Sequence, residues 1–337
     1  MTAAQLPNLL NLLLPDATQT DFLRAALRGD LNAWNRYCQR VGDPKTALGH
    51  DTLGIKRLVP QLYVSLRDAG AELDAEFVSY LRAAHVREEL RARTFSRICE
   101  SALQKLGESG ADFRVLKGVS LVESAYENWA LRHCHDVDLW LRRADCERAI
   151  SVLKSENFEV FETRANTTIL VHPTNLPISL HPNLFAFACD TSEFWVAQQT
   201  RRLGQIKIPT LSSEAELVHL LGHAATQNSR RSLLWCSDAW RLLQSAPDFE
   251  ARNFVNFAQK SGLAPAISAM SGFLKTALSA PIKAEIIENL GSCEGDVSRI
   301  LEGIHATAPS AQIIRSARRW NEKKAVSRWI LARVARK

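Results

Sequence analysis

The sequence predicts an α+β fold in which a small mixed β-sheet unit lies between two helical regions. Apolar residues recur at three- and four-residue spacing up to about residue 110, short strand-like segments follow up to about residue 210, and helical spacing then returns. We therefore expect an N-terminal helical region over 1–110, the mixed unit over 111–210, a C-terminal helical region over 211–312 and a basic tail over 313–337.

The N-terminal region contains three long stretches with helical spacing, over 20–41, 58–70 and 76–107. The first residues, MTAAQLPNLLNLLLPDATQTD, form a short apolar run that no basic segment precedes and that a proline and an aspartate soon interrupt. Such a run is too short for a signal peptide or a membrane span. We expect it to form a first amphipathic helix, and we expect no transmembrane segment.

The mixed unit begins after two glycines, at Gly107 and Gly110. Helical patterns at 119–128 and 144–155 separate the first three of its predicted strands. The segments predicted as strands are FRVLKG, HDVDLWL, FEVFET, TTILVH and PISLHPNL. Helical spacing returns at Ser213, which forms a predicted capping box with Glu216.

The composition is that of a folded protein with a substantial core, since 46% of the residues are hydrophobic and 23% are charged. The seven cysteines are widely spaced and include no C-x-x-C pair. This pattern suggests neither a disulfide framework nor a zinc knuckle, and it favours a reducing cytoplasm.

The segment RHCHDVDLWL, residues 132–141, carries the strongest chemical signal. On a strand, Asp136 and Asp138 share one face, while Val137 and Leu139 point to the opposite face and into a core. Two adjacent carboxylates repel each other unless a cation lies between them. A hard divalent ion such as Mg²⁺, which prefers oxygen ligands and bridges phosphates, is the natural candidate.

A phosphate-binding turn is predicted just upstream, in VLKGVSLVESAY. The strand ends at Lys117 and Gly118, and Ser120 lies at the start of a helical pattern. A glycine at such a turn lets the backbone approach a phosphate, and a helix N-terminus offers free N–H donors. The two segments together predict a phosphate cradle beside a metal pair.

The chain resembles the nucleotidyltransferase-like proteins of the DNA polymerase β superfamily, in particular a bacterial group described as uncharacterised nucleotidyltransferases. The resemblance spans roughly residues 55–245 and includes the LVPQLY helix. The segments that carry it are VLKGVSLVESAY, LRHCHDVDLWLRRADCERAISVL, PISLHPNL and LSSEAELVHLLGHAATQ with LLWCSDAWRLL.

The resemblance implies transfer of a nucleoside monophosphate from an NTP, ATP foremost, to an acceptor hydroxyl. The acceptor is a small molecule, a peptide, a protein side chain or an RNA end, and the sequence does not choose among them. Asp136 and Asp138 would hold Mg²⁺ or Mn²⁺. Gly118 and Ser120 would lie at the triphosphate, with Lys117 and Arg132 nearby.

The chain departs from the family pattern at Ser179, where the third carboxylate of the family would stand, although His181 is retained. Three interpretations follow: another acid such as Glu162 substitutes, His181 serves as the base, or the enzyme is slow or inactive. The second candidate function is therefore a catalytically weakened nucleotide-binding or scaffold protein.

Simpler interpretations accompany the other candidates. Lys117 and Arg132 also suit a role in neutralising the aspartates, and Ser120 suits a helix cap. His219 and His223 lie four residues apart, but HLLGH lacks the glutamate of the zinc-peptidase motif, so helix packing is favoured.

The tail, residues 313–337, carries nine of the 42 lysine and arginine residues but only one of the 36 acidic residues. Apolar residues recur in it at roughly helical spacing. Such a helix would bind an anionic partner, and three kinds of partner fit: a membrane surface, a nucleic acid or an acidic protein. The alternative is a solvated helix with its apolar stripe docked on the body.

Overall fold

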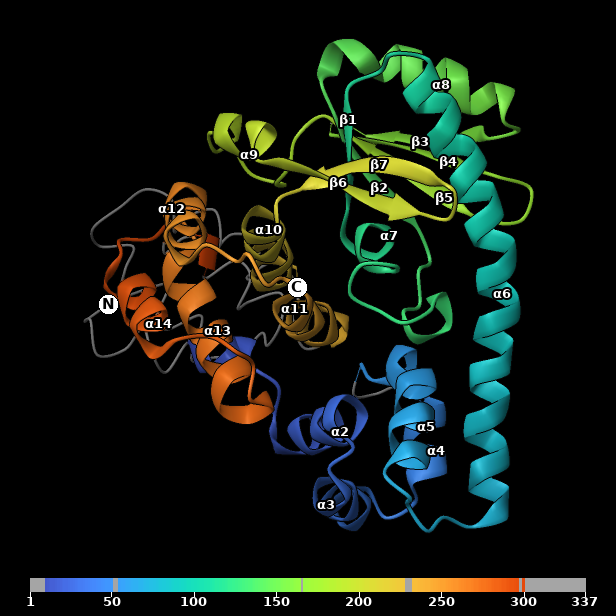
Figure 1. Ribbon diagram of the computed structural model, residues 1–337, viewed down its shortest axis with the longest axis vertical. Coiled ribbons are helices and arrows are strands. Elements are labelled where there is room, and N and C mark those ends of the chain that lie inside the picture. Colours follow the sequence, from blue (N-terminus) through green and yellow to red (C-terminus); the bar gives the residue numbers. More distant parts are fainter. Residues whose placement is uncertain (1–9, 51–53, 165, 228–231, 297–298, 301–337) are drawn as a thin grey trace, which may run out of the picture.

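The computed structural model describes residues 10–50, 54–164, 166–227, 232–296 and 299–300 (Figure 1). The predicted tail lies outside the described residues, as do residues 1–9 of the predicted first helix. In the described part of that segment, the chain forms only a short 3-10 turn, Asn11–Leu13, before the Asp16 cap of the next helix. Within the described part, the chain has the predicted α+β architecture, in which a seven-stranded mixed sheet is surrounded by helices.

The sheet has the strand order β3-β4-β5-β2-β1-β7-β6. Its centre is mixed, since β2 runs antiparallel to β1 but parallel to β5, and β1 runs parallel to β7. The strands are β1 (Phe113–Leu116), β2 (Val137–Leu141), β3 (Glu159–Arg164), β4 (Thr167–Val171), β5 (Pro177–His181), β6 (Gln198–Leu203) and β7 (Ile206–Leu211).

All five predicted strands are confirmed, but the prediction missed the hairpin of β6 and β7. A two-residue turn between Leu203 and Ile206 connects them, and Gly204 adopts φ 58° there. A glycine between two alternating segments is a hairpin signal, so these two strands were detectable from the sequence.

The helices before the sheet and after it bracket the strands along the chain. Those before the sheet are α2 (Ala17–Arg28), α3 (Leu31–Val41), α4 (Pro44–His50), α5 (Val59–Asp68) and α6 (Ala75–Glu108). Those within or between strands are α7 (Lys117–Leu121), α8 (Cys146–Ser155) and α9 (Ser192–Val196). Those after the sheet are α10 (Ser213–Thr226), α11 (Leu234–Ser245), α12 (Ala251–Ser261), α13 (Ala264–Leu278) and α14 (Ala284–Ser292).

The longest helix, α6, runs along one side of the molecule and reaches from the N-terminal helices to the sheet (Figure 1). It begins at the Asp74 cap, whose carboxylate accepts a hydrogen bond of 2.8 Å from the Phe77 backbone N–H. A capped N-terminus satisfies a backbone donor that would otherwise lack a partner. The second half of α6 packs against the sheet.

The two faces of β2 enter two different cores, as the alternation predicted. Val137, Leu139 and Leu141 pack with α6 and α8 in the core on one face of the sheet. Trp140 points to the other face and joins a large core that contains both N-terminal and C-terminal helices. The helices on either side of the strands in sequence therefore fold together, and Arg24 Nε also donates a hydrogen bond of 2.8 Å to the Ala277 carbonyl.

Two helical predictions were wrong. The helix predicted over 119–128 ends at Leu121, and the chain then turns so that the Tyr126 hydroxyl reaches Asp238. The predicted capping box is also absent, because Ser212 rather than Ser213 caps α10. Glu216 instead turns inward to a buried arginine.

Among the described helices, none has the length and apolar character needed to cross a bilayer. All seven cysteines are free thiols. The cytoplasmic location inferred from their spacing stays a prediction.

Candidate active site

A pocket of about 590 Å³ lies between one face of β2 and β5 and the helices α7, α10 and α11. This volume lies in the range typical of sites for ligands of nucleotide size. It brings together most of the residues that the sequence singled out: Lys117, Gly118, Arg132, Asp136, Asp138, Ser179 and His181.

Asp138 lines the pocket and is only 7% exposed. Its Oδ2 lies 2.9 Å from Lys117 Nζ, and its Oδ1 lies 2.7 Å from His181 Nε2. Burial alone would raise the pKa of Asp138, but the charge of Lys117 and the hydrogen bond with His181 outweigh it and hold the pKa well below its ordinary value. Asp138 is therefore ionised.

Asp136 directly precedes β2 and is more exposed than Asp138. Burial and the nearby charge of Asp138 raise the pKa of Asp136 to about 6. Its Oδ2 lies 3.4 Å from His135 Nε2. A cation beside the two aspartates would relieve the repulsion that raises this pKa.

The aspartate pair fits a magnesium ion that shares its coordination with a substrate. Mg²⁺ is usually bound by one or two carboxylates plus phosphates and waters rather than by a complete protein cage. No group of three or more His, Cys, Asp or Glu side chains in the described part of the chain is arranged to hold a metal ion. Asp136 and Asp138 are the residues that would hold it.

Lys117 has an unusual backbone, with φ 52°, at the turn from β1 into α7. This left-handed conformation costs a non-glycine residue about 1–2 kcal/mol. The Ser120 hydroxyl donates a hydrogen bond of 2.6 Å to the Lys117 carbonyl, which helps to hold the turn. The strained turn coincides with the point where the Lys117 ammonium meets Asp138.

Gly118 is required for a different reason from the predicted one. Its own φ is not positive, but a Cβ atom there would lie 3.1 Å from the Arg132 guanidinium and 3.1 Å from Cys134 Sγ. The missing side chain therefore lets Arg132 pack against the turn. A contact between Gly118 and a triphosphate stays a prediction.

Arg132 is buried and forms a bidentate ion pair with Asp238 of α11. Its Nε lies 2.7 Å from Oδ1 and its Nη2 lies 2.8 Å from Oδ2. The Tyr126 hydroxyl donates a further hydrogen bond of 2.6 Å to the same carboxylate. Arg132 thus lines the pocket, but its guanidinium is already engaged in attaching α11 to the loop before β2.

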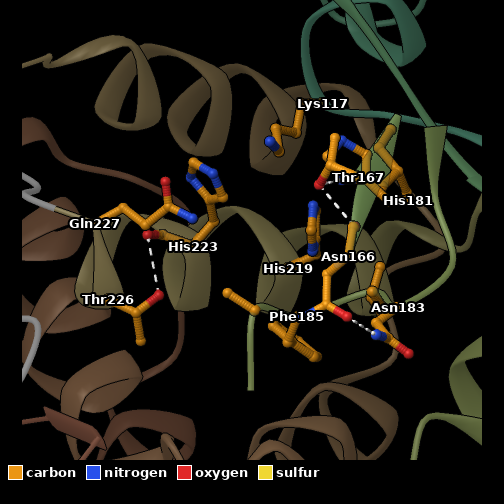
Figure 2. A pocket seen from close by; sticks show the side chains of 13 residues that line it. Lys117, Asn166, Thr167, His181, Asn183, Phe185, His219, His223, Thr226 and Gln227 are labelled. Carbon is orange, nitrogen blue, oxygen red and sulfur yellow. Dashed lines mark hydrogen bonds between the residues drawn. The ribbon is translucent and has the colours of Figure 1, made fainter. Parts of the chain in front are cut away.

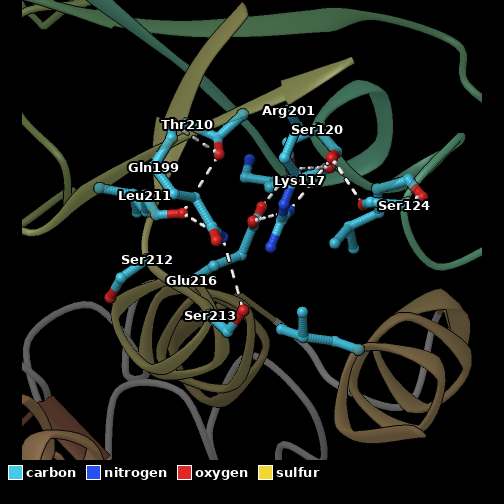
Figure 3. A network of polar contacts seen from close by, with 12 residues as sticks. Lys117, Ser120, Ser124, Gln199, Arg201, Thr210, Leu211, Ser212, Ser213 and Glu216 are labelled. Atoms are coloured by element: carbon cyan, nitrogen blue, oxygen red, sulfur yellow. Dashed lines mark hydrogen bonds and ion pairs between the residues drawn. The ribbon is translucent and has the colours of Figure 1, made fainter. Parts of the chain in front are cut away.

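Ser120 does not line the pocket. It is 2% exposed, and its hydroxyl contacts the carboxylate of Glu216, which Arg201 also binds (Figure 3). Burial raises the pKa of Glu216, and Arg201 and Ser120 oppose that shift. No local spacing predicts this network. The role of Ser120 at the triphosphate stays a prediction, which the geometry does not favour.

Ser179 lies directly beside Asp138, as its neighbour in the parallel pair of β5 and β2, and it lines the pocket. Glu162 lies on the edge strand β3, where both of its carboxylate oxygens lie 2.7 Å from Arg164 nitrogens. Glu162 is not among the residues that line the pocket, although its partner Arg164 is. The geometry therefore does not favour Glu162 as a substitute for the third acid.

Arg57 and Arg164 add two cations to the pocket wall, and neither was predicted as a site residue. Arg57 Nη1 lies 3.3 Å from His135 Nδ1. Burial and the charge of Arg57 lower the pKa of His135 to about 3, so that ring is neutral. Arg57 belongs to the turn before α5, far from the strands in sequence, which is why no local pattern revealed it.

A family model described as "Uncharacterised nucleotidyltransferase" matches residues 53–278, about two thirds of the chain. A solved structure, titled as that of an antigenic nucleotidyltransferase-like protein from Paracoccidioides brasiliensis, is 18% identical with a TM-score of 0.34. The similarity covers 57% of this chain and 95% of that chain. No curated protein matches the sequence. The extent of the family match shows that the chain belongs to the uncharacterised nucleotidyltransferase family.

Proposed function

We propose that the protein is a metal-dependent nucleotidyltransferase of the DNA polymerase β superfamily. It transfers a nucleoside monophosphate from an NTP, ATP foremost, to an acceptor hydroxyl. The observation that carries this proposal is the placement of Asp136 and Asp138 at one wall of a nucleotide-sized pocket in a chain of this family.

Charge makes the pocket suitable for a triphosphate. Lys117, Arg57 and Arg164 line it, and Arg and Lys side chains form strong charge-assisted hydrogen bonds with phosphate oxygens. Mg²⁺ or Mn²⁺ bound by Asp136 and Asp138 would neutralise negative charge on the reacting phosphates. On NTP binding, Lys117 would exchange part of its contact with Asp138 for a phosphate oxygen.

His181 is positioned to act as the general base. A carboxylate only accepts hydrogen bonds, so the contact with ionised Asp138 places the ring proton on Nε2. The lone pair is then on Nδ1. The Thr167 hydroxyl donates its hydrogen to the Asn166 carbonyl at 2.6 Å, and its oxygen lies 3.3 Å from Nδ1. An acceptor hydroxyl that approaches beside Thr167 would reach this nitrogen.

The transfer step follows from this arrangement. The acceptor oxygen forms a bond to the α-phosphorus, the bond from that phosphorus to the β-phosphate oxygen breaks, and pyrophosphate leaves with the electron pair. The proton of the acceptor hydroxyl passes to His181 Nδ1. Orientation of His181 by Asp138 would compensate for the neutral hydroxyl of Ser179.

One observation favours a second candidate, a nucleotide-binding or scaffold protein with weak activity. Ser179 is the direct neighbour of Asp138, and it offers no charge to a second metal ion. In this case the protein would bind NTP through the aspartates and the cations, but it would transfer the nucleoside monophosphate slowly or not at all.

The test is label transfer from [α-³²P]ATP, with Mg²⁺ or Mn²⁺ and a cell extract that supplies acceptors. The wild type is compared with Asp138→Asn and with Asp68→Asn, a matched change at an exposed aspartate. Transfer that Asp138→Asn abolishes and Asp68→Asn retains supports the enzyme. Equal transfer by all three proteins contradicts it, and NTP binding without transfer supports the second candidate.

A further inference from the structure

A second cavity, of about 140 Å³, opens beside the nucleotide-sized pocket (Figure 2). We call it the histidine cavity because His181, His219 and His223 line it. It shares part of its wall with the larger pocket, so the two sites meet at the proposed base. The shared residues are Lys117, Thr167, His181, His223 and Gln227.

His219, on α10, is the unusual member of this cavity. It is only 2% exposed, and neither of its ring nitrogens has a hydrogen-bond partner in the described part of the chain. Its ring centroid lies 5.6 Å from that of Phe185 and 6.1 Å from that of His223. Buried polar groups are nearly always paired, so two nitrogens without a partner on a residue that lines a cavity indicate that a ligand supplies the partner after a small shift of the ring.

The two histidines on α10 are neutral. Burial and the charge of Lys117 lower the pKa of His219 well below its ordinary value and lower the pKa of His223 to about 3. A neutral imidazole offers one donor and one acceptor. Each ring therefore suits a partner that both donates and accepts, as a hydroxyl does.

The rest of the cavity wall also consists mainly of uncharged side chains, several of which form hydrogen bonds. Asn166, Asn183 and Gln227 contribute amides, Thr226 contributes a hydroxyl, and Phe185 contributes a ring. Among the residues that line the cavity, Lys117 alone has a permanent charge, and it is paired with Asp138. This wall fits a neutral ligand with several hydroxyl groups and one apolar face.

The cavity also limits the size of the ligand. A cavity of roughly 150 Å³ holds one benzene molecule, so the histidine cavity accommodates an unsubstituted six-membered ring. Some of the hydroxyl groups of a sugar or cyclitol would extend into the adjoining larger pocket, with which the cavity shares part of its wall. A complete nucleotide does not fit.

We propose that the histidine cavity is the acceptor subsite and that it holds a neutral polyhydroxylated ring, a sugar or a cyclitol, with one hydroxyl at His181 Nδ1. This assignment rests on the proposed function. Thr167, whose hydroxyl already lies near Nδ1, stands where the two sites meet, so a hydroxyl entering from this cavity would approach the α-phosphate side of the base.

The experiment measures binding of D-glucose, D-ribose and myo-inositol by saturation-transfer NMR, with Mg²⁺ and α,β-methylene-ATP present. His219→Leu removes both ring nitrogens at similar size, and Thr226→Val removes a hydroxyl at nearly constant shape. The matched control is His85→Leu on α6, since His85 also has a buried nitrogen without a partner but does not line the cavity.

We expect at least one of the three ligands to bind the wild type and His85→Leu, and to bind His219→Leu at least tenfold more weakly and Thr226→Val more weakly. The affinity for the ATP analogue should be the same in all four proteins. Failure of all three ligands to bind the wild type, or equal binding by His219→Leu, overturns the assignment. So does a loss of ATP-analogue affinity in His219→Leu, since the cavity would then hold the nucleobase.

Two control measurements, the Tm of His219→Leu and the affinity of the wild type for the ATP analogue, distinguish failure of the acceptor subsite from failure of the proposed function. His219→Leu should fold with an unchanged or higher Tm, because it removes nitrogens that no protein group satisfies. A lower Tm identifies His219 as a structural residue and contradicts the proposal. If the wild type does not bind the ATP analogue, the proposed function fails, whereas loss of sugar binding alone rejects only the acceptor subsite.

Discussion

The ion pair of Arg132 and Asp238 gives the sharpest quantitative prediction. Both side chains are almost fully buried, at 8% and 2% exposure. Asp238 also accepts a hydrogen bond from Tyr126, so the pair connects the loop before β2 to α11. The resemblance had placed Arg132 near the triphosphate, whereas the geometry gives it a structural partner.

Removal of one partner should lower the free energy of unfolding far more than removal of both. Breaking a buried ion pair costs roughly 3–5 kcal/mol because it leaves an uncompensated charge, whereas replacing both partners is often nearly neutral. We expect Arg132→Met to lower the free energy of unfolding by about 3 kcal/mol. The double variant Arg132→Met with Asp238→Leu should recover at least half of that loss.

Urea denaturation followed by tryptophan fluorescence measures this double-mutant cycle. The control is Arg93→Met on α6, where Arg93 forms an exposed pair with Glu89 and should lose less than about 1 kcal/mol. The reasoning is refuted if Arg132→Met is as mild as Arg93→Met and shows no coupling to Asp238. Normal stability combined with a loss of NTP affinity would instead restore Arg132 to the phosphate site.

Three further predictions concern single residues. Lowering the pH from 7 to 5 should raise the free energy of unfolding of His219→Leu, relative to that of the wild type, by about 2 kcal/mol. The reason is that His219 of the unfolded wild type binds a proton as the pH falls below about 6.5, whereas the buried ring does not. The same difference in unfolding free energy between the two proteins at both pH values would contradict this. Gly118→Ala should cost about 1–3 kcal/mol, seen as a lower Tm in calorimetry, since its Cβ would press on Arg132; an unchanged Tm would show that the turn relaxes freely. Ser179→Asp should lower the Tm without metal, because a third carboxylate joins Asp138 and its neighbour, and Mg²⁺ should restore it; a Tm that does not respond to Mg²⁺ would argue against a metal site.

Local patterns in the sequence were enough to predict five of the seven strands and the acidic face of β2. The alternation from Val137 to Leu141 determined which side chains enter the core, and the structure agrees. Asp136 and Asp138 were found for the same reason, since charged residues in an apolar strand stand out. Strand periodicity is a local property, so one sequence is sufficient to detect it.

The partners of those residues were not predictable in this way. Arg132 meets Asp238 across 106 residues, and Ser120 meets Glu216 across 96 residues. Such pairs depend on the tertiary arrangement and leave no spacing signal in the chain. The same reason explains why Arg57, in the N-terminal region, was not expected at the pocket.

The most direct test of the central claim does not depend on the unknown acceptor. It is isothermal titration of α,β-methylene-ATP into the wild type, Asp138→Asn and Asp68→Asn, with Mg²⁺ and with EDTA. We expect Mg²⁺-dependent binding by the wild type and Asp68→Asn, and at least tenfold weaker binding by Asp138→Asn. Binding that ignores both Mg²⁺ and Asp138, or no binding by the wild type, would contradict a nucleotidyltransferase site at these aspartates.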